Sequence, residues 1–159
     1  MKNNKIINSI LTFLFNPAYQ VITLYRISYF LNKQKIPLLV LILRWWGYVV
    51  YSCEISFSSK IGKNLKLPHP MSIVIGAGVL IKDNVTIFQN VTLGGKGGDN
   101  EKGYPVVENG VVIYAGAKII GNIIIGQNAI IGANSVVMKD VPANSIAVGV
   151  PARIIEIVD

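Results

Sequence analysis

The sequence has few of the residues that carry chemistry or form cross-links. Cys53 is the only cysteine and His69 the only histidine among its 159 residues. A single thiol cannot form an internal disulfide, so a disulfide-stapled domain is excluded and a reducing compartment is expected. We therefore expect a cytoplasmic protein, in which any histidine chemistry depends on one imidazole.

Acidic residues are missing from the N-terminal third. Residues 1–53 contain six basic residues and no acidic one, whereas the rest of the chain, which begins at Glu54, carries a net charge of only +1. The same segment is rich in aromatic and aliphatic residues. Such a composition is typical of contact with an anionic membrane surface. The alternative is a basic helical segment packed on the rest of the protein with its charges in solvent.

Long uninterrupted apolar runs are missing as well. The uncharged stretch 6–25 is broken by polar residues and Pro17, and the more apolar stretch 36–51 is short and contains Arg44. A spanning helix needs about 20 mostly apolar residues, so we expect peripheral contact at the inner face of the membrane rather than a span. The start resembles a signal peptide, but no small-x-small cleavage site follows. The basic residues form no dense cluster, so no nucleic-acid partner is expected.

A six-residue repeat is what the sequence has in abundance. An Ile, Leu or Val recurs at every sixth position in two runs: Ile75, Ile81, Ile87 and Leu93, then Val107, Ile113, Ile119, Ile125, Ile131 and Val137. Four positions after these residues lie small or β-branched residues, such as Val79, Val85, Ala117, Ala129 and Ser135. This period is neither that of a helix nor the alternation of a hairpin, and it indicates a repeat architecture.

Each hexad is predicted to form one short strand and one corner. The large aliphatic points inward, the smaller residue fills the space near the corner, and Gly, Asn and Asp satisfy the corner's backbone geometry. Three such sides close a prism, and successive turns stack at the spacing of a β-ladder. We expect a mainly β fold, a parallel β-helix over 54–159 preceded by a short α-helical segment over 1–53; an ordinary β-sandwich of short strands is the less favoured alternative.

Two steps depart from the period of six. The step from Leu67 to Ile75 has eight residues and contains His69 between two prolines. The step from Leu93 to Val107 has fourteen residues, so the Gly- and Lys-rich stretch 95–106 is predicted to loop out of the prism. Exposed segments on a rigid scaffold are where binding and catalytic residues concentrate.

Four C-terminal motifs resemble the hexapeptide-repeat acyltransferases. They are "NVTLGG" (90–95), "AGAKIIGN" (115–122), "SVVMKDVP" (135–142) and "GVPARII" (149–155). The likeness is greatest to the serine acetyltransferase branch, which includes short relatives that acetylate cell-surface polysaccharides. The resemblance implies a left-handed coil, a homotrimer and acetyl-CoA as co-substrate. Handedness rests on the resemblance alone, because the usual crossover preference points the other way.

The resemblance also implies that His69 is the catalytic base, supported by Glu54. Acetyl transfer from a thioester to a hydroxyl needs a base and donors for the oxyanion, but neither a covalent intermediate nor a metal. Counting sides from Ile55 independently stacks the corner after His69 near Glu54, where a carboxylate could orient the imidazole. The alternatives are that His69 is an ordinary turn residue and Glu54 a solvated side chain.

Three positions depart from the serine-specific members of that family: Pro68 stands where they have an acidic residue before the base, and two further positions lack a histidine. Ser56 and Tyr104 stand where those members have histidines, which puts L-serine as the acceptor in doubt. Both are candidate substrate-binding residues, and Tyr104 could hydrogen-bond the acceptor or the thioester oxygen. The alternative is that Tyr104 only shapes the loop.

The acetyl-CoA site is expected along the groove between neighbouring prisms. Small residues there would let the pantetheine arm approach the backbone. The candidate cofactor-binding residues are Gly95, Ala115, Gly116 and Ala117, followed further along by Ser135, Lys139 and Arg153, with the two cations near the CoA phosphates.

Three functions remain open at this stage. The favoured one is an O-acetyltransferase acting on a sugar hydroxyl in surface polysaccharide biosynthesis, because the basic, apolar N-terminal segment suits a lipid-linked acceptor. The alternative is a serine O-acetyltransferase of cysteine biosynthesis. The third, a non-catalytic β-helix for assembly, is less favoured, because a scaffold has no need of a histidine in a proline-flanked bulge.

Overall fold

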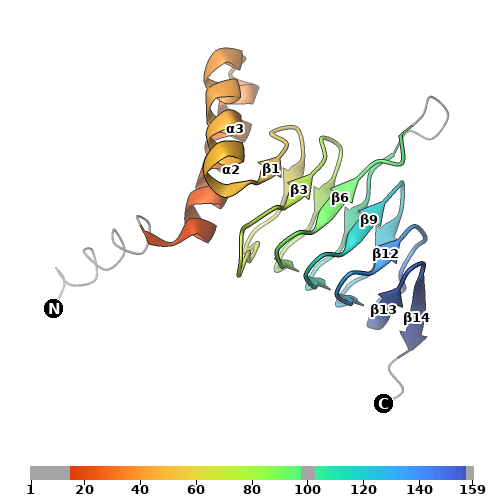
Figure 1. Ribbon diagram of the computed structural model, residues 1–159. Coiled ribbons are helices and arrows are strands. Elements are labelled where there is room, and N and C mark those ends of the chain that lie inside the picture. The colour runs from red at the N-terminus through yellow and green to blue at the C-terminus, as the bar shows by residue number, and fades with distance from the viewer. Residues whose placement is uncertain (1–14, 98–102, 157–159) are drawn as a thin grey trace, which may run out of the picture.

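The protein is a helical hairpin attached to one end of a triangular β-coil (Figure 1). The computed structural model describes residues 15–97 and 103–156. Helix α2 (Pro17–Lys33) and helix α3 (Pro37–Tyr51) come first, and the first strand begins at Glu54. The described strands are short and arranged on three faces, and from β1 to β13 they pair in parallel as the chain visits the faces in rotation.

Each face of the prism is a ladder of strands from successive turns. The first face holds β1 (Glu54–Ile55), β3 (Val74–Ile75), β6 (Thr92–Gly94), β9 (Lys118–Ile120) and β12 (Val136–Val137). The second holds β2 (Lys60–Ile61), β4 (Leu80–Ile81), β7 (Val106–Val107) and β10 (Ile124–Ile125). The third holds β5 (Thr86–Ile87), β8 (Val112–Ile113), β11 (Ile130–Ile131), β13 (Ser145–Gly149) and β14 (Ala152–Glu156), the last of which pairs antiparallel with β13.

The register of these ladders locates both interruptions of the repeat. Regular turns pair residues 18 apart, as in Ile75 with Leu93. Ile55 pairs with Ile75, a step of 20, because the first turn contains the bulge at His69. Ile81 pairs with Val107, a step of 26, because the stretch between β6 and β7 leaves the coil. The turns between the loop and the C-terminal end keep the step of 18, and the last turn is two residues shorter, because Ile131 pairs with Ala147. Both insertions therefore project from a scaffold that is regular between them and the last turn.

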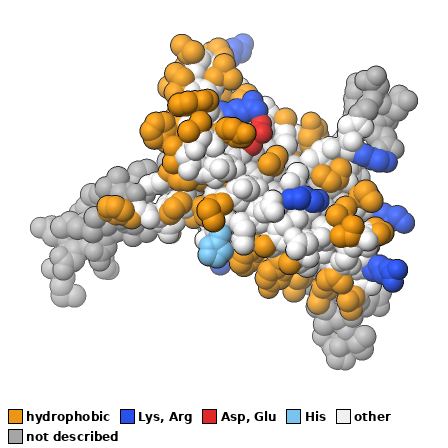
Figure 2. Space-filling model, in the orientation of Figure 1, with side chains coloured by type: hydrophobic (Ala, Val, Ile, Leu, Met, Phe, Trp, Pro, Cys, Tyr) orange, Lys and Arg blue, Asp and Glu red, His pale blue; other side chains and the backbone are white. Residues whose placement is uncertain are grey.

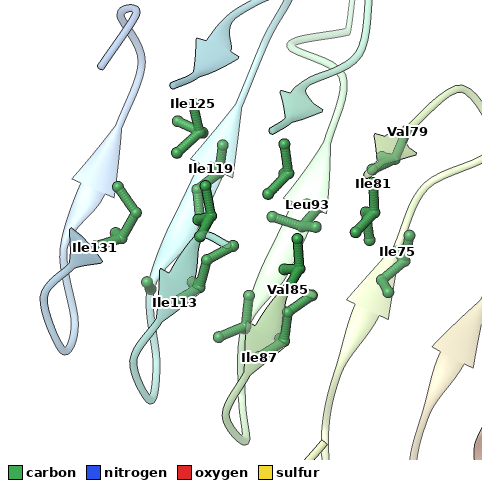
Figure 3. Close-up of a cluster of buried hydrophobic side chains, with 14 of the residues drawn as sticks. Ile75, Val79, Ile81, Val85, Ile87, Leu93, Ile113, Ile119, Ile125 and Ile131 are labelled. Carbon is green, nitrogen blue, oxygen red and sulfur yellow. The ribbon is translucent and has the colours of Figure 1, made fainter. Parts of the chain in front are cut away.

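The inward aliphatics fill the prism completely. All ten residues of the six-step series are at most 2% exposed, and the second series from Val79 to Val141 is buried with them. Figure 3 shows these side chains stacked inside the coil, turn above turn. Burying a side chain of this size is worth about 1.5–3 kcal/mol, so this column is the main source of stability.

The corners are built by asparagine and glycine in the left-handed backbone region. Asn84 and Asn128 are among six asparagines with positive φ in the described coil. The Asn128 side chain donates to the Oδ1 of Asn144 on the next turn, at 3.2 Å. Gly116 has φ of +76°, and a Cβ there would lie 2.0 Å from the Oδ1 of Asn134. Glycine is therefore required at this corner.

The hairpin is tied to the prism by α2. The Asn16 side chain caps α2 by accepting a hydrogen bond from the Ala18 amide. The hydroxyl of Tyr25 donates to the Ser59 carbonyl at 2.9 Å, and burial raises the pKa of that phenol. Arg26 donates to the Ile61 carbonyl at 2.6 Å. Neither described helix is both long enough and apolar enough to cross a bilayer.

Candidate active site

His69 lies at the edge where the chain passes from the third face to the first. It is exposed (Figure 2), and its backbone carbonyl accepts a hydrogen bond from the Met71 amide at 2.8 Å. The following residue, Pro70, is buried, and its carbonyl accepts a hydrogen bond from the Cys53 thiol at 2.9 Å. Burial raises the pKa of that thiol, so it stays protonated and keeps the bulge anchored. The imidazole is thus presented to solvent from a fixed backbone.

A pocket of about 560 Å³ adjoins the histidine. One wall is the bulge itself, from Pro68 to Ser72. The opposite wall comes from the helices: the start of α2 at Asn16 and Pro17, and the end of α3 at Val50 and Tyr51. The pocket is therefore large enough for a small acceptor and is shared between the two parts of the molecule.

Glu54 lies in β1, but its carboxylate faces the hairpin. It forms an ion pair with Arg44 of α3. It lines a different hollow, together with Trp45 and Tyr48. Among the described residues, no ion pair within 4.0 Å joins Glu54 to His69. Glu54 therefore lies on the turn that the sequence predicts. Its partner in the structure is Arg44 of α3, which lies outside the repeat and could not be found by counting hexads.

The remaining candidates sort onto two edges of the first face. The edge before that face, here called the His69 edge, carries His69, Ala115, Gly116, Ala117 and Ser135. The edge after it, here called the Tyr104 edge, carries Ser56, Gly95, Tyr104 and Lys139. Arg153 lies beyond both, in β14. Within one chain the predicted base and the predicted loop residue are thus on opposite edges of one face.

Tyr104 is held on the Tyr104 edge by a platform of glycines. A Cβ on Gly78 would lie 2.1 Å from its ring, and one on Gly76 would lie 3.0 Å away. Gly95 touches the same ring from the other end of the loop. Ser56 sits in the same column, where its hydroxyl accepts a hydrogen bond from the Ser58 amide at 3.2 Å. The glycines therefore fix the ring of Tyr104 against the coil.

The cofactor candidates differ in how open they are. Ala115 is half-buried at a corner of the His69 edge, beside the buried Gly116 and Ala117. Ser135 is fully buried, and its hydroxyl accepts a hydrogen bond from the Gly149 amide at 3.1 Å, so it holds β13 in place. Lys139 and Arg153 are both exposed, as cations that meet phosphates must be.

Two aromatic residues of the His69 edge, Phe88 and Tyr114, were missed in the sequence. The rings of Phe88 and Tyr114 stack at 5.2 Å between centroids, and the His69 ring lies 6.4 Å from Phe88. The three rings form a ladder, one from each of three successive turns. The sequence does contain a signal for these two residues. Phe88 and Tyr114 each directly follow an inward isoleucine, and they lie 26 residues apart, which is the distance between paired positions on these two turns.

Gln89 lies on the same edge, directly after Phe88. Its Oε1 is buried and has no hydrogen-bond partner among the described residues. A buried acceptor without a donor is unfavourable, so this amide is suited to an incoming N–H group or to a water.

Comparisons with known proteins agree with this architecture. Residues 104–139 match the family model described as bacterial transferase hexapeptide (six repeats). The chain is 37% identical over 139 residues to the serine acetyltransferase of Synechococcus elongatus, with 87% of this chain and 57% of the relative covered. It is 42% identical over 142 residues to that of Haemophilus influenzae, with 89% and 53% covered.

A solved structure of a serine acetyltransferase in complex with CoA superposes with a TM-score of 0.82 at 42% identity, with 89% of this chain and 58% of that one covered. The predicted left-handed parallel β-helix is therefore confirmed. The chain spans a little more than half the length of these relatives.

Proposed function

We propose that the chain is a hexapeptide-repeat transferase that moves an acetyl group from acetyl-CoA to an alcohol hydroxyl, with His69 as general base. The observation that carries this proposal is the position of the chain's single imidazole, exposed on a fixed bulge and lining a pocket of suitable size. A structural neighbour at 42% identity is a complex with CoA, which supports acetyl-CoA as the donor. A cytoplasmic location, where acetyl-CoA is made and used, belongs to the same proposal.

The reaction requires only one proton carrier. As the acceptor oxygen attacks the thioester carbonyl, an unprotonated nitrogen of His69 takes the hydroxyl proton. The tetrahedral intermediate then collapses, the carbon–sulfur bond breaks, and the imidazolium returns the proton to the CoA sulfur. No metal enters this sequence of steps.

L-serine is the better supported acceptor. The similar curated proteins named above are serine acetyltransferases, and their identity of about 40% extends over nearly nine-tenths of this chain. The alternative interpretation of the sequence therefore has more support than the favoured one, the sugar of a surface polysaccharide.

A sugar hydroxyl remains the second candidate because of the ring ladder. Pyranose rings stack with their C–H faces on aromatic side chains, and the Phe88–Tyr114 stack lies directly above His69. Ser56 and Tyr104, where serine-specific relatives are expected to have histidines, favour the same acceptor. A free amino acid has no apolar ring face that could use this stack.

The donor is proposed to lie between neighbouring copies of a homotrimer. The His69 edge and the Tyr104 edge of one chain lie on opposite sides of one face. A second copy is therefore needed to place its Tyr104 edge next to the His69 edge of the first. Gly95 and the run from Ala115 to Ala117 would then admit the pantetheine arm, with Lys139 and Arg153 near the phosphates.

The acceptor is tested by measuring thiol release from acetyl-CoA with L-serine and with a panel of sugars and nucleotide sugars. We expect L-serine to give the highest kcat/KM. A sugar acceptor that exceeds it would establish the second candidate, and no thiol release with any hydroxyl acceptor would refute both.

His69→Ala should lower kcat by roughly 10²–10⁴-fold, the usual contribution of a general base. Lys63→Ala, an exposed change on the same turn of the coil, is the matched control and should leave kcat unchanged. Both variants should keep the oligomeric state of the unaltered protein in size-exclusion chromatography with light scattering. An active His69→Ala enzyme would remove the imidazole from the mechanism.

Glu54 remains a predicted positioning residue for His69. Its role is tested by comparing a variant of Glu54 with a variant of Arg44, the residue with which it forms an ion pair. If the carboxylate turns to His69 in the complete assembly, Glu54→Gln should lower kcat and shift the acidic limb of the pH profile, while Arg44→Gln should not. If Glu54 only anchors α3, the two variants should give the same pH profile.

A further inference from the structure

Helix α3 has two apolar faces, and its own chain covers only one. Val40, Leu43 and Gly47 lie on the side that faces α2 and the prism, and Val40 is the one residue of the helix that is fully buried. The opposite side carries a continuous set of exposed apolar residues at helical spacing, here called the outer face: Leu38, Leu41, Ile42, Trp45, Trp46, Tyr48 and Val49. Figure 2 shows apolar side chains gathered over this helical part of the surface.

The exposure of this face is unusual in extent. Leu41 is 54% exposed, Trp45 61% and Trp46 50%. Scattered exposed apolar residues need no explanation, but a contiguous set of this size marks a surface that is covered by something else. The prism does not need the outer face for its own stability, because its core is already closed.

Beside the outer face, Glu54 is the one acidic residue among the described residues that line the hollow at Trp45 and Tyr48, and it is paired with Arg44. Residues 1–53 contain no acidic residue. Lys33 and Lys35 lie at the turn between the two helices, next to the start of α3, and both are exposed. Arg26 binds backbone carbonyls of the prism, and the Arg44 charge is paired with Glu54. Among the described residues of the hairpin, the other cations are therefore those at the turn, where the Lys33 ammonium lies 4.6 Å from the centroid of the Tyr29 ring.

An anionic bilayer surface matches both properties. Lysines next to an apolar helix face are attracted to acidic headgroups, and tryptophan and tyrosine are favoured at the boundary between headgroups and acyl chains. A helix of 15 residues is too short to span but long enough to lie along the surface with one face immersed.

A contact between the outer faces of two copies matches less well. Two outer faces packed together would bring the lysines of both hairpin turns into one interface. The hairpin offers no carboxylate to neutralise them, since Glu54 is the first acidic residue and already has a partner. Like charges at close range in an apolar setting disfavour such a contact.

We propose that the outer face of α3 docks the protein on an anionic membrane surface, with the helix lying parallel to the bilayer. This docking is independent of which acceptor the enzyme uses. It would hold the His69 pocket, whose wall includes the end of α3, close to the headgroups.

The chain carries its own probe for this contact. Trp45 and Trp46 are its only tryptophans, so the intrinsic tryptophan emission of the full chain reports on α3 alone. On addition of phosphatidylcholine vesicles containing phosphatidylglycerol, the emission should shift to shorter wavelength and acrylamide should quench it less. Binding to vesicles of phosphatidylcholine alone should be weaker by roughly tenfold or more, and high salt should remove this difference.

Substitutions on the outer face test the residues themselves. Leu41→Gln with Trp45→Gln should weaken co-sedimentation with the anionic vesicles by roughly tenfold. Lys33→Gln with Lys35→Gln should reduce the preference for anionic over neutral vesicles. Ile155→Gln is the matched control: this residue is as exposed as those of the outer face, lies in β14 at the far end of the prism (Figure 1), and should leave binding unchanged.

Two results would overturn the proposal. One is an emission spectrum of the unaltered protein that does not change with anionic vesicles. The other is a loss of oligomeric state in the Leu41→Gln, Trp45→Gln protein in the absence of lipid, which would assign the outer face to contact between copies. Neither result would affect the thiol-release assay, so failure of the docking is distinguishable from failure of the proposed activity.

Discussion

The prism and the helical hairpin are both rich in apolar residues, but they use them in opposite ways. In the prism, all ten aliphatics of the six-step series are buried inside the coil. In α3, only Val40 is fully buried, while most of the other apolar side chains are exposed. A period of six points each aliphatic of the series into the same interior. A helix that is apolar on nearly all sides has more apolar surface than its one packing contact can cover. Apolar content alone therefore does not tell whether a segment is core or interface.

The sharpest test of this contrast is one deletion in each region. Ile119→Ala removes a fully buried side chain from the middle of the prism and should cost about 2–5 kcal/mol in free energy of unfolding. Leu41→Ala removes a side chain of similar size from the outer face and should change that free energy by about 0.5 kcal/mol or less. Urea denaturation followed by far-UV circular dichroism measures both. Equal costs would mean that the outer face is packed within the protein itself.

A smaller effect tests how tightly the corners of the prism fit. Gly116 and Gly97 have nearly the same positive φ, +76° and +75°, but only Gly97 has open space around its Cα. Gly97→Ala should cost about 1 kcal/mol for the backbone conformation alone. Gly116→Ala should cost about 2–3 kcal/mol, because the methyl group would also strike the Asn134 side chain of the next turn. Equal losses of stability in thermal unfolding would show that the corner yields.

Periodicity explains why the prism could be predicted in detail. A repeat specifies for each residue whether it points inward, and the inward positions from Ile75 to Val137 were all assigned correctly from spacing alone. The two departures from the period also located the bulge at His69 and the loop between β6 and β7. Each of these inferences needs only the local count of residues.

Contacts between the prism and segments outside the repeat could not be predicted in this way. The pairing of Glu54 with Arg44 depends on how α3 packs on the first turn, which no count within the coil describes. The contact of the Tyr104 ring with Gly78 depends on the path of the loop between β6 and β7, which lies outside the six-residue register. The sequence could therefore nominate candidate residues one by one, but their arrangement over two edges required the structure.

The ion pair between hairpin and prism is expected to contribute little. The side chains of Arg44 and Glu54 are 46% and 38% exposed, so solvent screens their attraction. Arg44→Gln should lower the free energy of unfolding by about 1 kcal/mol or less. Urea denaturation at low and at high salt measures it, and the difference between the variant and the unaltered protein should shrink as salt rises. A large, salt-independent loss would mean that the hairpin depends on this contact for its position.

The smallest effect concerns Cys53, the residue at which the hairpin meets the prism. Burial raises the pKa of its thiol, so the unfolded chain loses the thiol proton first as pH rises through the ordinary value of 9.0. Ionisation then favours the unfolded state, and the stability that Cys53 contributes is complete below that value and declines above it. Burial raises the pKa of Tyr25 too. Because Tyr25 is present in both the unaltered protein and the Cys53→Ala variant, its contribution to the pH dependence cancels when the two are compared. Between about pH 8 and about pH 10, the unaltered protein should therefore lose more stability in urea than Cys53→Ala. Identical losses would mean that the thiol is open to solvent and that the junction is looser than the contact between Cys53 and the Pro70 carbonyl indicates.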